Sequence, residues 1–154
     1  MAAVMFTDRE MQRAWQANLQ ASSHSASSNA HRLLLFYAIE CGLKAILMKR
    51  RSVTCTNHCR EFSEAQHDIN KLLDILSAGQ ALKLPSQFNM SPINDKGSKQ
   101  DRKLNPGKIN QMWRYGGKVL ERLDDSGISI GFTDEDIEQH LIKISRWIQK
   151  ELRQ

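Results

Sequence analysis

The sequence predicts an all-α protein, an up-and-down bundle of four to five helices built from a single domain over residues 1–154. Three observations predict it. Apolar residues recur at spacings of three and four along most of the chain, helix-capping residues precede these stretches, and no stretch alternates between apolar and polar residues as a strand does. A chain of this length can bury a core of its own, so we expect it to fold without a metal or a disulfide.

The first two predicted helices have clear starting signals. Thr7 and Glu10 form a capping box, which predicts a helix over residues 8–23. Ser28 and Asn29 are both suitable N-caps for the next helix, over residues 29–51. Its apolar residues surround nearly the whole helix. Three basic residues end it, where their positive charge interacts favourably with the negative end of the helix dipole. We expect this helix to be the longest and the most buried.

The rest of the chain divides into shorter segments. Residues 52–66 have no period and predict a loop, whereas residues 67–79 predict a short third helix that ends at a glycine. Residues 80–105 are rich in charge and contain two prolines, which predicts an exposed, mobile connection. Pro106 begins a fourth helix whose apolar stripe continues to Leu123, and Thr133 caps a fifth helix that runs to the end of the chain.

Composition narrows the class of protein. The net charge of +5 and the pI of about 9.3 suit an anionic partner such as nucleic acid or a nucleotide, and equally suit a merely soluble surface. Three cysteines exclude a complete internal disulfide framework, and the first residues lack a signal peptide, so we expect a cytoplasmic protein. The longest apolar run, residues 33–48, is interrupted by Glu40 and Lys44 and is too short to cross a bilayer, so we expect no membrane partner.

One cluster of residues has the types that bind zinc. Cys55, His58, Cys59 and His67 lie close together in the sequence, and thiolates and imidazoles are the usual ligands of zinc. The spacing of three residues between the cysteines is unusual, and no second pair of cysteines follows. An ordinary loop with reduced thiols is the alternative, and we expect no metal and no cofactor.

Two polar features lie in otherwise apolar helical stretches. Glu40 and Lys44 are one helical turn apart, in the order that favours an ion pair. The pair either stabilises the core alone or also positions a ligand or a catalytic arginine from a neighbouring helix. Arg114 and Tyr115 form the second feature, since a guanidinium and a ring can grip phosphate and stack a base.

Further observations extend the second feature. Gly116 and Gly117 weaken a helix, which indicates either close packing between helices or close approach of a ligand. Basic residues elsewhere could form a surface that attracts phosphate. They are Lys49, Arg50, Arg51, Arg60, Lys96, Lys99, Arg102, Lys103 and Lys108.

Three stretches resemble the HEPN family, named for higher eukaryotes and prokaryotes nucleotide-binding. HRLLLFYAIECGLKAILMKRR resembles the long central helix of that family, HDINKLLDIL resembles its next helix, and INQMWRYGGKV is similar to a later one. The resemblance covers about half of the chain. It implies a helical bundle, usually a dimer, in a toxin–antitoxin, anti-phage defence or regulatory complex that binds RNA, a nucleotide or a protein partner, here a second copy or a product of the same operon.

Ribonucleases of the HEPN family carry an Arg-x4-6-His motif late in the bundle, and Arg114 has no histidine at that distance. Arg51 and Arg60 each precede a histidine at the permitted distance, but about one such match is expected by chance. We therefore expect binding without the standard motif; a metal-independent ribonuclease and a purely structural adaptor or antitoxin are the alternatives. For cleavage the candidate residues are His67 as general base and Arg114 as the stabilising cation, with His140 as the substitute histidine. The candidate ligand-binding residues are Arg114, Tyr115, Glu40, Lys44 and Arg51.

Overall fold

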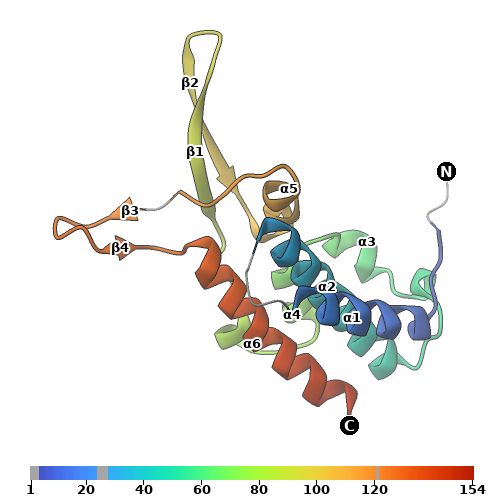
Figure 1. Ribbon diagram of the computed structural model, residues 1–154. Coiled ribbons are helices and arrows are strands. Elements are labelled where there is room, and N and C mark those ends of the chain that lie inside the picture. Colours follow the sequence, from blue (N-terminus) through green and yellow to red (C-terminus); the bar gives the residue numbers. More distant parts are fainter. Residues whose placement is uncertain (1–3, 24–27, 121) are drawn as a thin grey trace.

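Three long helices form the centre of the protein in this computed structural model, which describes residues 4–23, 28–120 and 122–154 (Figure 1). They are α1 (Asp8–Ser22), α2 (Asn29–Arg51) and α6 (Asp134–Leu152), and each begins where its cap predicts. Thr7 and Thr133 complete capping boxes at the starts of α1 and α6, and the Ser28 hydroxyl accepts a hydrogen bond from the first turn of α2. The predicted long helices are confirmed.

Helix α2 lies at the centre of this group. It runs antiparallel to α1, because the segment before α1 pairs with the segment after α2 through a bridge between Thr7 and Cys55. It runs parallel to α6, since ion pairs join the two helices at both ends: Arg32–Glu138 at 3.7 Å and Arg50–Glu151 at 3.3 Å. Several of the largest fully buried side chains come from α2, namely Phe36, Ile39, Leu43, Ile46 and Met48. The prediction of a central buried helix is confirmed.

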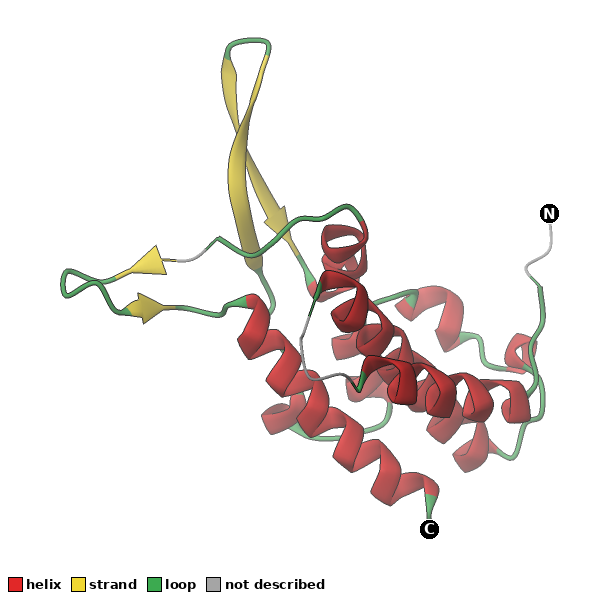
Figure 2. Ribbon diagram, in the orientation of Figure 1, coloured by secondary structure: helices red, strands yellow, loops and turns green. Residues whose placement is uncertain are grey.

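Short helices cover another side of α2. The stretch predicted as a loop contains the 3-10 turn η1 (Thr56–His58) and the helix α3 (Glu61–Ala65), so that prediction is wrong in part. Helix α4 (Ile69–Ile75) is the short helix predicted after it, and the 3-10 turn η2 (Gln80–Leu82) follows. The described part of the chain is therefore mostly helical (Figure 2), and none of its helices is long and apolar enough to cross a membrane.

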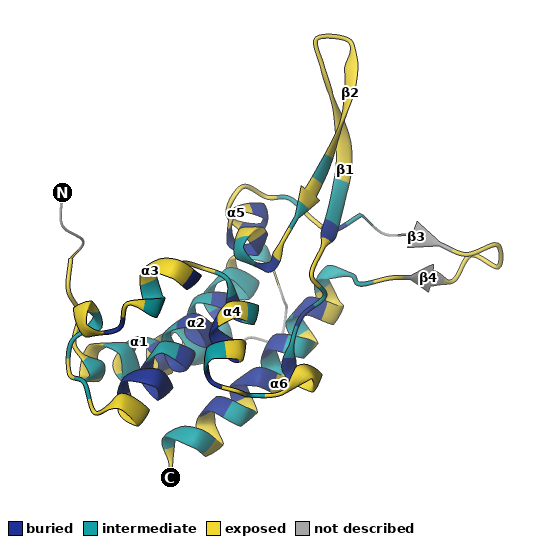
Figure 3. Cartoon of the chain, turned by 180° about the vertical axis from the view of Figure 1, so that it is seen from behind, coloured by how far each residue is buried: buried dark blue, intermediate teal, exposed yellow. Residues whose placement is uncertain are grey.

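The predicted unstructured connection is instead a β-hairpin. Strands β1 (Phe88–Asp95) and β2 (Ser98–Leu104) pair antiparallel and project away from the helices, with a turn at Lys96 and Gly97. The expected exposure is confirmed over residues 91–101, and only the base of the hairpin is partly covered (Figure 3). Strands were not predicted because the segment is rich in charge and contains two prolines. The apolar residues that it buries, Phe88, Met90 and Leu104, lie only at the base of the hairpin, which is too short a pattern to mark a half-buried strand.

The predicted fourth helix is much shorter than expected. After the 3-10 turn η3 (Pro106–Lys108), helix α5 spans only Ile109–Arg114. Gly116 follows in the left-handed conformation at φ +78°, and the Gly117 amide donates to the Met112 carbonyl at 2.7 Å, so the helix ends in a Schellman motif. The chain then forms a second small antiparallel hairpin, β3 (Arg122–Leu123) with β4 (Ser129–Ile130), before α6.

Candidate functional site

Four polar side chains lie on one side of α2. Tyr37, Lys44 and Arg51 repeat every seven residues, and Glu40 lies one turn from both Tyr37 and Lys44, so helical geometry places all four on the same side. Glu40 is buried, Tyr37 and Lys44 are half-buried, and Arg51 is exposed. We call these four residues the polar row.

The centre of the polar row is a buried carboxylate with two basic partners. Glu40 is 5% exposed, and its Oε1 atom lies 3.5 Å from Lys44 Nζ and 2.7 Å from His67 Nδ1. The Lys44 ammonium also lies 5.5 Å from the centre of the Phe62 ring, in a cation–π contact. The predicted Glu40–Lys44 pair is therefore present, and the fold adds His67 to it. Two partners satisfy a carboxylate that would otherwise be costly to bury.

His67 reaches Glu40 from a tight turn between two short helices. Gln66 ends α3 in a left-handed conformation at φ +51°, and Asp68 caps α4 by accepting a hydrogen bond from the Lys71 amide. The side chain of His67 is half exposed at 50%, and its Nε2 makes no hydrogen bond to any described residue. The imidazole is thus fixed at Nδ1 and accessible at Nε2, which is the arrangement of an oriented acid–base histidine.

Arg114 joins the polar row from α5. Its guanidinium donates a hydrogen bond to the hydroxyl of Tyr37. Hydrogen bonding to Tyr37 and to Tyr115 raises the pKa of Arg114 above its ordinary value. Since Tyr37 and Glu40 are separated by about 4.5 Å of helix rise, Arg114 and His67 contact adjacent turns of α2. The two candidates for catalysis, far apart in the sequence, therefore both contact the polar row.

The other candidates lie at the edges of this site or outside it. Arg51 pairs with Glu61 of α3, which raises the pKa of Arg51 and lowers the pKa of Glu61, so the guanidinium already has an anionic partner. His140 bonds through Nε2 to the Leu82 carbonyl at 2.8 Å, on the side of α6 that contacts η2, and does not touch the polar row. Tyr115 is 78% exposed and lies just beyond Arg114.

The four residues with zinc-binding side chains have other surroundings in the fold. Cys59 is buried in the apolar core at 3% exposure, and His67 is held by Glu40. Over the described ranges, no group of three or more histidine, cysteine, aspartate or glutamate side chains is arranged to hold a metal ion.

Cys41, next to Glu40 on α2, gives a direct test of burial beside the polar row. Burial and the neighbouring Glu40 carboxylate raise the pKa of the Cys41 thiol to about 11. Because only the thiolate reacts, we expect alkylation of Cys41 by iodoacetamide to accelerate about tenfold per pH unit from pH 8 to 10. Mass spectrometry of the tryptic peptides measures this, with Cys55 as the internal reference. A rate that stops rising below pH 9 would contradict the expectation.

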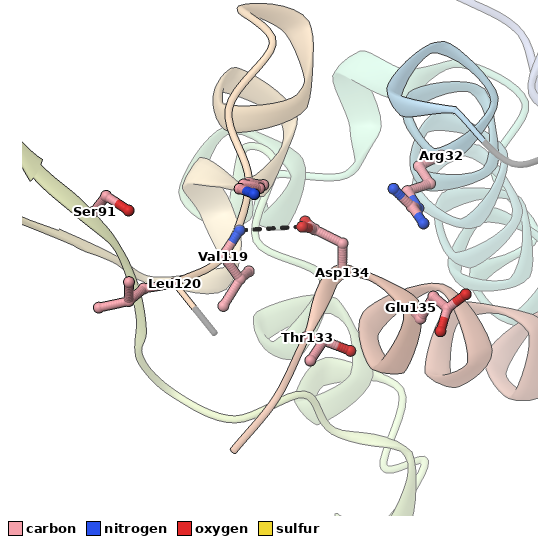
Figure 4. A pocket seen from close by; sticks show the side chains of 8 residues that line it. Arg32, Ser91, Val119, Leu120, Thr133, Asp134 and Glu135 are labelled. Carbon is pink, nitrogen blue, oxygen red and sulfur yellow. Dashed lines mark hydrogen bonds between the residues drawn. The ribbon is translucent and has the colours of Figure 1, made fainter. Parts of the chain in front are cut away.

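A cavity of about 480 Å³ lies at the start of α6 (Figure 4), and no residue of the polar row lines it. One of its walls is Asp134, whose carboxylate accepts hydrogen bonds from Trp113 Nε1 at 2.8 Å and from the Val119 amide at 3.1 Å. These contacts hold α5, and with it Arg114, against α6. Asp134 is therefore a residue that positions the site.

The same cavity contains charges of both signs. Arg32 and Lys118 line it together with Asp134 and Glu135, and the view in Figure 4 shows Arg32 on α2 facing the start of α6. Carboxylates of this kind repel an anionic ligand and offset the two cations. The cavity is less suited to phosphate than the polar row is.

Two features of the site were not predicted. Tyr37 packs against the apolar core, as its place in the apolar helix indicates, but its hydrogen bond to Arg114 was not predicted, although its spacing from Glu40 and Lys44 in the sequence was a usable signal. Gly117 does mark close packing, but against the hairpin and not between helices, because a Cβ there would lie 2.4 Å from Met90 Cε. The contact with the hairpin could not be predicted, because the two strands were not predicted.

Comparison with known proteins finds no counterpart: no protein-family model, no curated protein and no solved structure matches the chain. A function for this protein is therefore inferred from the geometry of the site.

Proposed function

We propose that this protein is a HEPN-like helical protein that binds RNA at the polar row and acts in a cytoplasmic toxin–antitoxin, anti-phage defence or other regulatory complex. The observation that carries the proposal is the half-exposed His67, held by the buried Glu40 at 2.7 Å, on the turn of α2 next to the one that holds Arg114. A histidine oriented by a carboxylate beside an arginine is an arrangement suited to a phosphodiester.

The charges of the site support an anionic ligand. Arg114 is exposed and donates to Tyr37 through one nitrogen, which leaves other N–H groups of the guanidinium fork for phosphate oxygens. Lys44 lies at the next turn of the row and is partly exposed, with 18% of its side chain accessible. The chain as a whole carries a net charge of +5, which favours the approach of a polyanion.

The second candidate function is metal-independent cleavage of the bound RNA, and the Glu40–His67 contact favours it. In the tautomer that donates its Nδ1 proton to Glu40, the imidazole of His67 carries its lone pair on Nε2. Nε2 removes the proton of a 2′-hydroxyl, the 2′-oxygen bonds to the adjacent phosphorus, and the 5′-oxygen leaves with a proton from water. Arg114 stabilises the charge on the phosphorus oxygens. The products are a 2′,3′-cyclic phosphate and a 5′-hydroxyl.

Binding of a fluorescein-labelled single-stranded RNA tests the proposal by fluorescence anisotropy. Arg114→Ala is expected to weaken binding about tenfold, because a charge-assisted contact to phosphate is lost. Arg146→Ala removes an exposed arginine of α6 outside the polar row and is expected to change Kd less than twofold.

Equal Kd values for the two variants would contradict RNA binding at the polar row. A wild-type protein that binds no RNA and co-purifies with a stoichiometric protein partner would favour the structural adaptor instead. The exposed apolar residues Val4, Met5 and Phe6 would then be the first surface to examine.

A further inference from the structure

A second cavity, of about 550 Å³, lies between the base of the β1–β2 hairpin and the end of α5. Met90 and Arg102 line it from the hairpin, while Met112, Tyr115 and Lys118 line it from α5 and the segment that follows. We call this cavity the hairpin cleft. Its volume falls in the range of sites that hold small molecules or parts of larger ligands.

Backbone pairing and close packing build the hairpin cleft. Strand β1 pairs with Val119 across an isolated bridge to Met90, and the Leu120 amide donates to the Asn89 carbonyl at 2.7 Å. A Cβ at Gly117 would lie 2.4 Å from Met90 Cε, the flexible end of that side chain, and 3.1 Å from the Met112 carbonyl oxygen, so glycine leaves room for Met90 in its present position. On the far strand, Arg102 Nε donates to the Ser91 carbonyl at 2.8 Å, where a bulge interrupts the pairing. The hairpin is therefore held against α5, and the cleft between them is preformed.

The side chains that line the hairpin cleft suit a nucleotide. Tyr115 presents a ring that is 78% exposed, and the thioethers of Met90 and Met112 provide apolar surface. Arg102 and Lys118 supply positive charge. Lys118 also lines the neighbouring cavity, but it makes no hydrogen bond or ion pair within the part of the chain that the structure describes. No carboxylate lines this cleft, in contrast to the neighbouring cavity with Asp134 and Glu135.

We propose that the hairpin cleft binds one unpaired nucleotide of an RNA strand, with the base stacked on Tyr115 and the phosphate bound by Arg102 and Lys118. This inference rests on the proposed function, because Arg114 of the polar row immediately precedes Tyr115. A strand whose base lies on Tyr115 continues over Arg114 towards His67. The cleft then selects which phosphodiester lies at the polar row, and single strands are bound in preference to duplexes, whose bases are not available for stacking.

Stacking is tested with single-stranded RNA that carries one 2-aminopurine, moved along the strand from one oligonucleotide to the next. We expect quenching of its fluorescence at one position when the wild-type protein binds. Tyr115→Ala is expected to abolish this quenching and to weaken binding about 10- to 100-fold. Tyr115→Phe keeps the ring and is expected to retain both properties, which separates stacking from the contact of the Tyr115 hydroxyl with Arg114.

The phosphate contact is tested by the dependence of Kd on salt. Lys118→Gln is expected to reduce the slope of log Kd against log salt by about 0.7, the value for one phosphate of a single strand. Lys150→Gln, which removes an exposed lysine near the end of α6, is the matched control and is expected to leave the slope unchanged.

The outcomes separate the cleft from the polar row. If Arg114→Ala weakens binding while Tyr115→Ala and Lys118→Gln behave as wild type, the inference about the cleft is wrong and the proposed function stands. If the wild-type protein binds no RNA, both are wrong. The last measurement uses free 2-aminopurine ribonucleoside monophosphate. If it binds as tightly as the RNA strand does, the assignment to RNA is wrong and the cleft is a mononucleotide site.

Discussion

His67→Ala is expected to slow the cleavage of single-stranded RNA in the presence of EDTA by about 100- to 10,000-fold, the usual loss when a general base is removed. The substitution leaves the 2′-hydroxyl without an acceptor for its proton, whereas the phosphate contact of Arg114 remains. Binding should therefore change little while the rate of the chemical step falls. Denaturing gels of end-labelled RNA measure the rate, and anisotropy with an RNA that carries a 2′-methoxy group at every position measures the affinity.

Two further variants decide whether the loss is specific. Glu40→Gln retains the size of the side chain but removes the charge that orients His67, and it is expected to lower the rate about 100-fold or more. His58→Ala removes an exposed histidine of η1 and is expected to have no effect. If His67→Ala and His58→Ala cleave at the same rate, or if wild-type protein does not cleave at all, the ribonuclease candidate is wrong and RNA binding alone remains the proposal.

Phe36→Ala is expected to lower the free energy of unfolding by about 3–5 kcal/mol. The ring is fully buried, and it meets Trp113 and Tyr37 edge-on with centroid distances of 6.5 and 6.2 Å. Removing it leaves a cavity between α2 and α5 that neighbouring side chains cannot fill without moving. Urea denaturation followed by circular dichroism measures the change, and the Tm should fall by about 10 °C.

Phe6→Ala is the matched control for this prediction, because it removes the same ring from a site that is 44% exposed. Its cost should stay below about 1 kcal/mol. A loss of less than 1 kcal/mol in Phe36→Ala would show that α5 does not depend on this contact. The position of Arg114 relative to the polar row would then need another explanation, with the Trp113–Asp134 hydrogen bond as the remaining constraint.

The long helices could be predicted because their signals are local. The capping boxes at Thr7 and Thr133 and the apolar periodicity of residues 29–51 act within a few residues of each other, and the structure retains all of them. The predicted Glu40–Lys44 pair is also a local signal, since one helical turn separates the two residues.

The two large errors both involve segments whose structure depends on partners. The stripe of apolar residues after Gly116 matches helical spacing, yet the left-handed glycine ends α5 and Val119 pairs with β1 instead. The β1–β2 hairpin buries apolar residues only at its base, at Phe88, Met90 and Leu104, so the apolar pattern is too short to indicate strands. The positive φ angles at Lys96 and Gly97 allow its tight turn, but a lysine followed by glycine is a weak turn signal.

The long helices and the Glu40–Lys44 pair follow from local sequence, because helix formation and capping depend on neighbours within one or two turns. Which of the candidate residues meet depends on how the helices pack. The tertiary structure places His67 on Glu40 and Arg114 on Tyr37, contacts that span 27 and 77 positions, and it leaves His140 on another surface. Such contacts depend on how whole helices pack. The apolar residues that drive packing do not indicate which polar groups the packed helices bring together.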